Sequence, residues 1–227
     1  MNRPYIISHM MMSVDGRIDC PMVAQISGDE YYTALESFGV SSKLSGRVTA
    51  ALECSAVAEE TEGCSGTGLA AECFHQAVQA EEYTIVVDTR GRLQFNQSQA
   101  DGHPLLVVMS EQVTEAHLEQ LSQQGVSWIA TGRERIDLSR AVEILHSEFG
   151  VERLVVVGGG FINSGFLQAG LIDEVSVMIA PGVDGRQGQT AVFDGCTWKA
   201  DAPYRLRLKS VSQVEGTEVL WVRYTCR

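Results

Sequence analysis

The run Gly158-Gly159-Gly160 is the part of this sequence whose residue types point most directly to ligand binding. It follows the apolar residues 154–157, which predict a buried strand, and precedes residues 163–169, which predict a short helix. Glycines let a ligand approach the backbone closely, and the first N–H groups of a helix and its dipole attract an anion. The spacing predicts a phosphate or pyrophosphate site, with an unliganded strand-to-helix turn as the alternative.

The run does not complete either of two common nucleotide-binding patterns. A GxGxxG fingerprint would need glycine at position 163, which is Asn163, and no Gly-Lys-Ser/Thr of a P-loop follows. The glycines alone therefore do not decide between the two interpretations, and the rest of the chain has to supply the evidence.

Three further candidates each follow a predicted strand. Asp15 follows the apolar segment 5–12, Thr89 and Arg90 follow 83–87, and Thr131 follows 126–130. A carboxylate can stabilise a cation or relay a proton, and an arginine fork suits a phosphate. Because ligands of open α/β sheets bind beyond the carboxyl ends of the strands, we expect these residues and the glycine run at one sheet edge. Asp15 also precedes Gly16, so a plain turn is its alternative role.

The elements that position these residues alternate between strand and helix. Besides the strands already named, 105–109 and 175–180 predict strands, and 28–38, 114–124 and 137–149 predict helices. The final segments 204–211 and 218–225 predict a hairpin around Gly216. This order predicts an α/β fold with a mixed, mostly parallel sheet, helices on both faces and a C-terminal antiparallel hairpin. No domain boundary is evident, so we expect a single domain over residues 1–227, with 59–68 as a loop.

Composition excludes several classes of protein. The net charge is −12 with three lysines, so nucleic-acid binding is not expected, and an anionic ligand must be held by local donors. No apolar run is long enough to span a membrane, and a cytoplasmic location is expected. The six cysteines include no CxxC pair, and the fragment Cys64, Cys73 and His75 lacks the spacing of a zinc site, so no metal is expected.

Three motifs together resemble those of the riboflavin-pathway pyrimidine reductases, which have a dihydrofolate-reductase-like fold. S-V-D-G-R-I at 13–18 resembles the family's S-[LV]-D-G-[KR]-I turn, and G-R-V-T at 46–49 resembles its G-R-x-T element. Residues 158–174 are similar to its G-G-x-x-x-N-x-x-x-L-x-x-G-L-[IV]-D-E signature, continued by Pro181 and Gly185. The resemblance covers nearly the whole chain.

The resemblance implies a homodimeric reductase that uses NADPH to reduce a phosphoribosylaminopyrimidine to its ribityl form. It places Asp15 near the nicotinamide and the substrate as the catalytic carboxylate, and Thr89 and Arg90 at the 2′-phosphate. The remaining implied cofactor contacts come from the matched motifs and from the shared sheet edge: Gly46, Arg47, Thr49, Thr131, Gly158, Gly159, Gly160, Phe161, Ile162 and Asn163.

Two departures keep other functions open. Val157 stands where family members often carry glutamate, and the acidic residues 59–68 replace a segment that helps to hold the substrate phosphate. A reductase of the same fold with another small substrate is therefore the second hypothesis. A nucleotide-binding protein without catalytic activity is the third.

Overall fold

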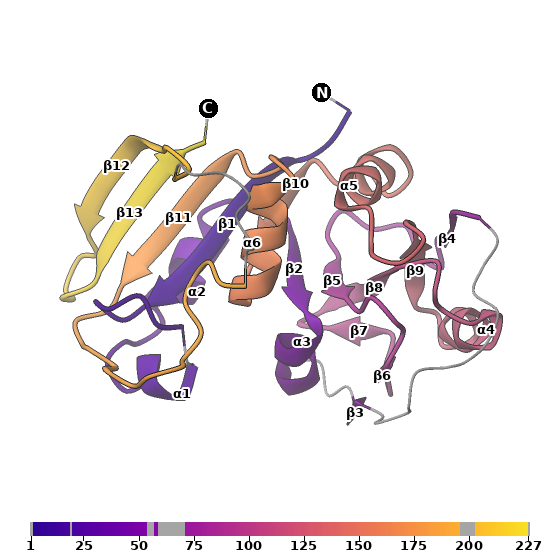
Figure 1. The fold of residues 1–227 in the computed structure, drawn as a ribbon, viewed down its shortest axis with the longest axis horizontal. Helices are drawn as coiled ribbons and strands as arrows, with labels where there is room; N and C mark the ends of the chain where they lie inside the picture. The colour runs from indigo at the N-terminus through magenta and orange to yellow at the C-terminus, as the bar shows by residue number, and fades with distance from the viewer. Residues whose placement is uncertain (1, 19, 54–56, 59–70, 196–202, 227) are drawn as a thin grey trace. The chain divides into compact units, whose positions relative to one another are not determined.

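The computed structural model describes residues 2–18, 20–53, 57–58, 71–195 and 203–226 (Figure 1). They group into two compact units: unit 1 contains Met1–Pro4 and Val40–Leu154, and unit 2 contains Tyr5–Gly39 and Val155–Arg227. Each unit is described by itself below. The single domain expected from the sequence stays a prediction, and the loop expected at 59–68 lies outside the described residues.

Unit 1 is built on four parallel strands. They are β2 (Ser42–Gly46), β5 (Thr84–Val87), β8 (His103–Met109) and β9 (Ser127–Ala130), in that order across the sheet. β4 (Cys73–His75) pairs antiparallel with β9, β7 (Gln99–Ala100) pairs antiparallel with β8, and β3 (Val57–Ala58) pairs with β6 (Leu93–Gln94). The parallel register brings the carboxyl ends of the four strands to one edge of this sheet.

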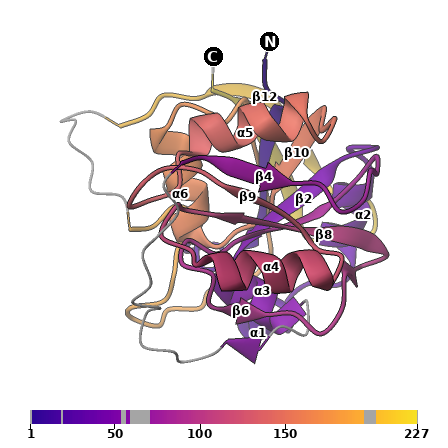
Figure 2. The ribbon, with the colours of Figure 1, turned by 90° about the vertical axis from the view of Figure 1, so that its right-hand side faces the viewer.

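Helices cover both faces of the unit 1 sheet. α4 (Glu115–Gln123) and α5 (Leu138–Ser147) lie on opposite sides of the strands (Figure 2), and α3 (Arg47–Glu53) follows β2 directly. Leu118 and Leu121 of α4 pack with Val107 and Met109 of β8 in one buried cluster. β5, β9 and most of β8 are buried, as apolar strands between two helical layers should be.

Unit 2 has a sheet in the order β12-β13-β11-β1-β10. β1 (Tyr5–Met12) and β11 (Glu174–Ile179) are parallel, while β13 (Leu220–Thr225) and β12 (Arg207–Gln213) add antiparallel strands. β10 (Arg153–Val156) begins at the boundary between the units and leads into α6 (Gly160–Gln168). The short helices α1 (Cys20–Val23) and α2 (Glu30–Glu36) follow β1.

Alternate residues of β1 face different helices. Ile7, His9 and Met11 pack on the side of α2, where the ring of His9 stacks on Tyr31 with 4.7 Å between ring centroids. His9 is completely buried, its Nδ1 lies 2.9 Å from Ser176 Oγ, and burial lowers its pKa to about 4. Met10 points to the other side, against the glycine run.

The predicted α/β fold class and the C-terminal hairpin are confirmed, and the predicted helices and strands are present with shifts of a few residues at their ends. Several elements were missed or misplaced, among them the short α1, β3, β4, β6 and β7, which were not predicted. β2 and α3 were not predicted, and α6 begins at Gly160, three residues earlier than expected. Among the described residues, no helix is long and apolar enough to cross a membrane.

Candidate active site

The glycine run forms the turn between β10 and α6, and its three members have different surroundings. Gly158 has φ +110°, and a Cβ there would lie 3.0 Å from Met10. A Cβ on Gly160 would lie 2.2 Å from the carbonyl oxygen of Ala191. A Cβ on Gly159 would meet no atom within 4 Å. The backbone conformation therefore favours glycine at 158 and packing requires it at 160, whereas at 159 the space is open. The Gly158–Gly159 peptide bond is cis.

The first turn of α6 has no acceptor of its own for its leading N–H groups. Gly159 is the N-cap and carries no side chain, and the first turn contains no acidic residue. The Gly159 carbonyl accepts the later N–H groups, from Ile162 at 2.9 Å and Asn163 at 3.1 Å. The start of this helix, where Gly159 is half-buried, can therefore bind an anion through backbone N–H groups and the helix dipole.

The other predicted residues of this turn have different roles. Asn163 is fully buried, and its Nδ2 donates to the carbonyl oxygen of Val192 at 2.8 Å, while its Oδ1 is buried without a hydrogen-bond partner. Ile162 is half-buried, and Phe161 is 67% exposed with its ring against Gly195. The Asn163 side chain thus fixes the turn, and its backbone N–H is already donated to the Gly159 carbonyl, so the expected contact of Asn163 with a cofactor stays a prediction.

Asp15 lies in the turn after β1, and its carboxylate is held by protein donors. Oδ1 accepts from Ser13 Oγ at 2.6 Å and from the backbone N–H of Asp184 at 2.9 Å. Oδ2 accepts from the backbone N–H of Gly185 at 3.0 Å, and Arg17 Nε is 4.0 Å away. These hydrogen bonds, led by the one from Ser13, hold the pKa of Asp15 well below its usual range. The group is ionised at neutral pH and is a poor proton donor.

Residues 181–195, which we call the strap, connect this turn to the start of α6. At one end the Val14 N–H donates to the Gly182 carbonyl at 2.7 Å, and Arg17 Nη1 donates to the Gln189 carbonyl at 2.6 Å. At the other end the Asp194 N–H donates to the Gly160 carbonyl at 3.2 Å. The structure therefore brings Asp15 and the glycine run into one connected region of unit 2. The contacts that the strap makes in this region were not predicted from the sequence.

In unit 1 the remaining predicted residues lie at the carboxyl ends of parallel strands. Gly46 is buried at the end of β2 in register with Val87 of β5, and Arg47 and Thr49 lie in the first turn of α3. Thr89 and Arg90 follow β5, with Arg90 exposed. The Thr89 carbonyl accepts from Ser110 N at 3.0 Å and from Ser110 Oγ at 2.7 Å. This turn is also fixed by Asp88, whose Oδ2 accepts from the backbone N–H groups of the following turn at 2.5 and 2.7 Å.

Thr131 lies at the same edge of unit 1, but its side chain is occupied. It is buried at the end of β9, and its hydroxyl donates to Glu72 Oε2 at 2.8 Å. Glu72 Oε1 in turn accepts from Arg140 Nε at 2.9 Å. The hydroxyl of Thr131 is thus part of a protein network, which no local sequence pattern predicts.

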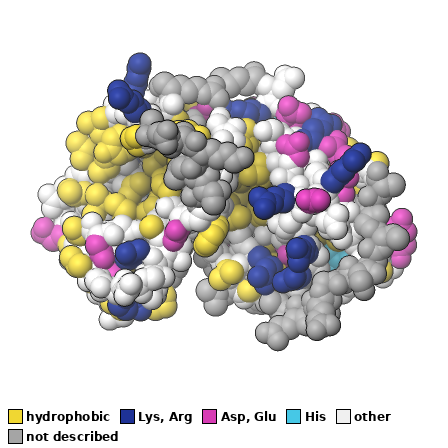
Figure 3. Space-filling view, in the orientation of Figure 1, with side chains coloured by type: hydrophobic (Ala, Val, Ile, Leu, Met, Phe, Trp, Pro, Cys, Tyr) yellow, Lys and Arg dark blue, Asp and Glu magenta, His cyan; other side chains and the backbone are white. Residues whose placement is uncertain are grey.

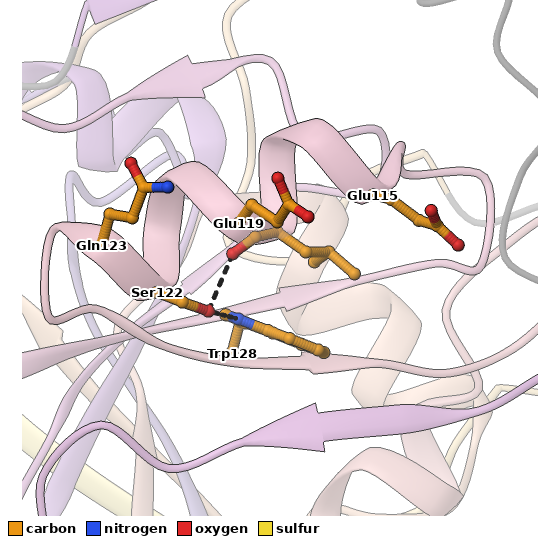
Figure 4. Close-up of a pocket in the computed structure, with 6 residues that line it drawn as sticks. Glu115, Glu119, Ser122, Gln123 and Trp128 are labelled. Carbon is orange, nitrogen blue, oxygen red and sulfur yellow. Dashed lines mark hydrogen bonds between the residues drawn. The ribbon is translucent and has the colours of Figure 1, made fainter.

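A hollow elsewhere on unit 1 contains none of the predicted residues. It lies beside α4, and Trp128 Nε1 donates to Ser122 Oγ at 3.0 Å at its base (Figure 4). Glu115 and Glu119 give it an acidic rim, so it does not suit a phosphate. Among the described residues, no group of three or more His, Cys, Asp or Glu side chains could hold a metal ion, and Cys64 lies outside them.

Comparison with known proteins points to one family. The family model described as "RibD C-terminal domain" matches residues 4–220. A 2,5-diamino-6-ribosylamino-4(3H)-pyrimidinone 5′-phosphate reductase from Methanothermobacter thermautotrophicus is 31% identical over an alignment of 231 positions that covers 99% of each chain.

Two solved structures share the fold at lower identity. A pyrimidine reductase-like protein from Corynebacterium diphtheriae has a TM-score of 0.71 at 16% identity, over 99% of this chain and 92% of its own. Acinetobacter baumannii RibD has a TM-score of 0.70 at 19% identity, over 99% of this chain and 58% of its own.

Proposed function

Because the chain belongs to the family of the RibD C-terminal domain, we propose that it is a reductase of riboflavin biosynthesis. The proposed substrate is 2,5-diamino-6-ribosylamino-4(3H)-pyrimidinone 5′-phosphate, for which the relative from Methanothermobacter thermautotrophicus is named, or its deaminated form. The ribosyl group is reduced to ribityl when its open-chain imine gains a hydride at C1′ and a proton at nitrogen. NADPH, when bound, supplies the hydride. The proposal includes a cytoplasmic location.

The observation that carries this proposal is the combination of Gly159 and the uncapped start of α6. The positive φ favours glycine at 158 and packing requires it at 160, but a Cβ on Gly159 would meet no protein atom within 4 Å. A glycine there is explained by a ligand that approaches the backbone closely. Since α6 begins without a capping side chain or an acid, that ligand is best an anion, and we assign it as the pyrophosphate of the cofactor.

We assign Thr89 and Arg90 to the 2′-phosphate that distinguishes NADPH from NADH. Arg90 is exposed after β5, on a backbone that Ser110 and Asp88 hold in place. For Arg90→Ala we expect the Kd for NADPH to rise about tenfold, because one charge-assisted contact is lost. The Kd for NADH should stay unchanged. Arg205→Ala, which removes one exposed positive charge in unit 2, is the control. An equal loss for both nucleotides would assign Arg90 to another part of the cofactor.

A homodimer is part of the proposal, with the outer surface of the C-terminal hairpin as the contact between copies. Hydrophobic side chains gather over this part of unit 2 (Figure 3), and Leu208 and Val211 of β12 are 61% and 58% exposed. β12 is the last strand of its sheet, and every residue in it is exposed. A second copy would cover both the edge and its apolar side chains. Sedimentation equilibrium of Leu208→Glu should show monomers where the native chain shows dimers.

The decisive experiment is NADPH oxidation by the purified protein with the ribosylaminopyrimidine 5′-phosphate in its amino and deaminated forms, and with NADH as the control cofactor. We expect turnover of one form with NADPH. Binding of NADPH without turnover of either form would reject the substrate and leave the cofactor assignment in place. Absence of binding to either nucleotide would reject the proposed function as a whole.

A further inference from the structure

Asp15 is bound by the strap through two backbone donors and by its own turn through one hydroxyl. Its carboxylate oxygens accept from Asp184 N at 2.9 Å, Gly185 N at 3.0 Å and Ser13 Oγ at 2.6 Å. Three of the roughly four acceptor positions of a carboxylate are therefore used inside the protein. We propose that Asp15 is a positioning residue that fixes the strap and, through it, the start of α6. The inference rests on the proposed function, because the start of α6 is where the cofactor pyrophosphate is assigned.

The strap transmits the position of Asp15 to the glycine run by a continuous series of contacts. Beyond Gly185 it is held to the turn after β1 by Ile18 N, which donates to the Thr190 carbonyl at 3.2 Å. The next residue, Ala191, has its carbonyl oxygen 2.2 Å from the place of a Gly160 Cβ. Val192 then accepts from Asn163 Nδ2 at 2.8 Å. The backbone of the strap thus forms one wall against the first turn of α6.

The contacts at the two ends of the strap differ in kind. At the α6 end they are a neutral side-chain amide and backbone groups. At the other end an ionised carboxylate accepts two successive backbone N–H groups, and hydrogen bonds to a charged acceptor are the stronger class. Asp184 is half-buried and Gly185 is exposed, and both hydrogen bonds to Asp15 are accessible to solvent, so water can replace the carboxylate if it is removed. Loss of Asp15 should therefore loosen the strap without unfolding unit 2.

The test is Asp15→Asn, which keeps the size of the side chain but replaces one acceptor oxygen by an NH₂ donor facing a backbone N–H group. Arg186 lies in the strap next to Gly185, so limited trypsin digestion reports on strap release at the Arg186–Gln187 bond. We expect cleavage at this bond to be about tenfold faster than in the native protein. We also expect the Kd for NADPH, measured by calorimetry, to rise about tenfold, because one charge-assisted hydrogen bond is lost. The kcat at saturating NADPH, measured on the same variant, separates a loss of positioning from the loss of a catalytic group. Asp101→Asn, an exposed turn aspartate of unit 1, is the matched control.

Two results would overturn the proposal. Unchanged trypsin cleavage would show that Asp15 does not hold the strap. A large fall in kcat with unchanged cleavage and Kd would identify Asp15 as a catalytic residue that acts on the substrate. Ser13→Ala, which removes the 2.6 Å donor but keeps the carboxylate, should give a smaller change of the same kind. Since cleavage is measured without nucleotide, failure of the proposed function would appear as absent NADPH binding in the native protein, separately from the strap result.

Discussion

α4 and α6 are both nine-residue helices, but they begin in different ways. At the start of α4 the Thr114 hydroxyl accepts the backbone N–H of His117 at 3.3 Å, and at the start of α5 Asp137 does the same for Arg140 at 3.0 Å. α6 begins at Gly159 with no such acceptor. A capping side chain contributes about 1 kcal/mol to helix stability. The N-cap Asp29 of α2 makes no such hydrogen bond either, but the first turn of α2 carries Glu30. α6 has neither a capping side chain nor an acid in its first turn, which is why we assign its N–H groups to an acceptor from outside the chain.

The same contrast exists within the glycine run itself. Gly158 is required by its positive φ, and Gly160 is confined by the strap. Gly159 is confined by no protein atom. On the assignment proposed above, the turn contains glycines needed by the fold beside a glycine that admits a ligand, so substitution at the two kinds of position should affect different measurements.

The largest effect is expected for Gly159→Asp. The N-cap backbone, at φ −76° and ψ −167°, is in the extended region that capping aspartates adopt, and no protein atom obstructs the side chain. The new carboxylate would accept the leading N–H groups of α6 and repel the pyrophosphate. We expect the Kd for NADPH to rise by about 100-fold, and the free energy of unfolding to stay equal or to increase by about 0.5 kcal/mol.

Calorimetric titration with NADPH and urea unfolding on the same preparation check both parts of this prediction. Gly159→Asn, with a neutral capping side chain, separates competition for the N–H groups from charge repulsion. If Gly159→Asp bound NADPH as tightly as the native chain, the start of α6 would not be the pyrophosphate site, and its missing cap would need another explanation.

The next effect is on stability and concerns Gly160→Ala. The new methyl group would lie 2.2 Å from a backbone oxygen of the strap, which cannot rotate away as a flexible side chain could. Overpacking of this kind typically costs about 1–3 kcal/mol, so urea unfolding should show a loss of about 2 kcal/mol. Gly159→Ala is the matched control, because its methyl group meets no atom. A similar loss of stability for both variants would mean that the distinction between the two glycines is wrong.

Much of the fold could be predicted because most strands are apolar runs bounded by turn residues. β2 was missed because its sequence, Ser42-Lys43-Leu44-Ser45-Gly46, has one strongly apolar residue. In the fold Ser42 is buried, and its hydroxyl accepts the backbone N–H of Tyr83 at 3.0 Å. That partner is 41 residues away along the chain, so no local pattern reveals that the polar side chain is satisfied.

The candidate site could be predicted to a similar extent as the fold. Strand ends and glycines identified the turn at 158–160 and the turn that contains Asp15. The strap could not be predicted, since Asp15 and Asp184 are 169 residues apart, and 182–190 is apparent in the sequence only as a glycine-rich loop. The partner of Thr131 was likewise hidden, because Glu72 reaches it from a segment 59 residues earlier.

The smallest effect, and the sharpest control for the comparison of helix starts, is Thr114→Ala. It removes the acceptor for His117 N at the start of α4, so we expect a loss of about 0.5–1 kcal/mol in urea unfolding. Thr114→Ser keeps a hydroxyl acceptor and should restore most of that loss. Neither variant should change the Kd for NADPH, because α4 contains none of the residues assigned to the cofactor. If Thr114→Ala weakened NADPH binding as much as it lowered stability, loss of any helix cap would impair the site. The missing cap of α6 would then no longer be evidence for a ligand.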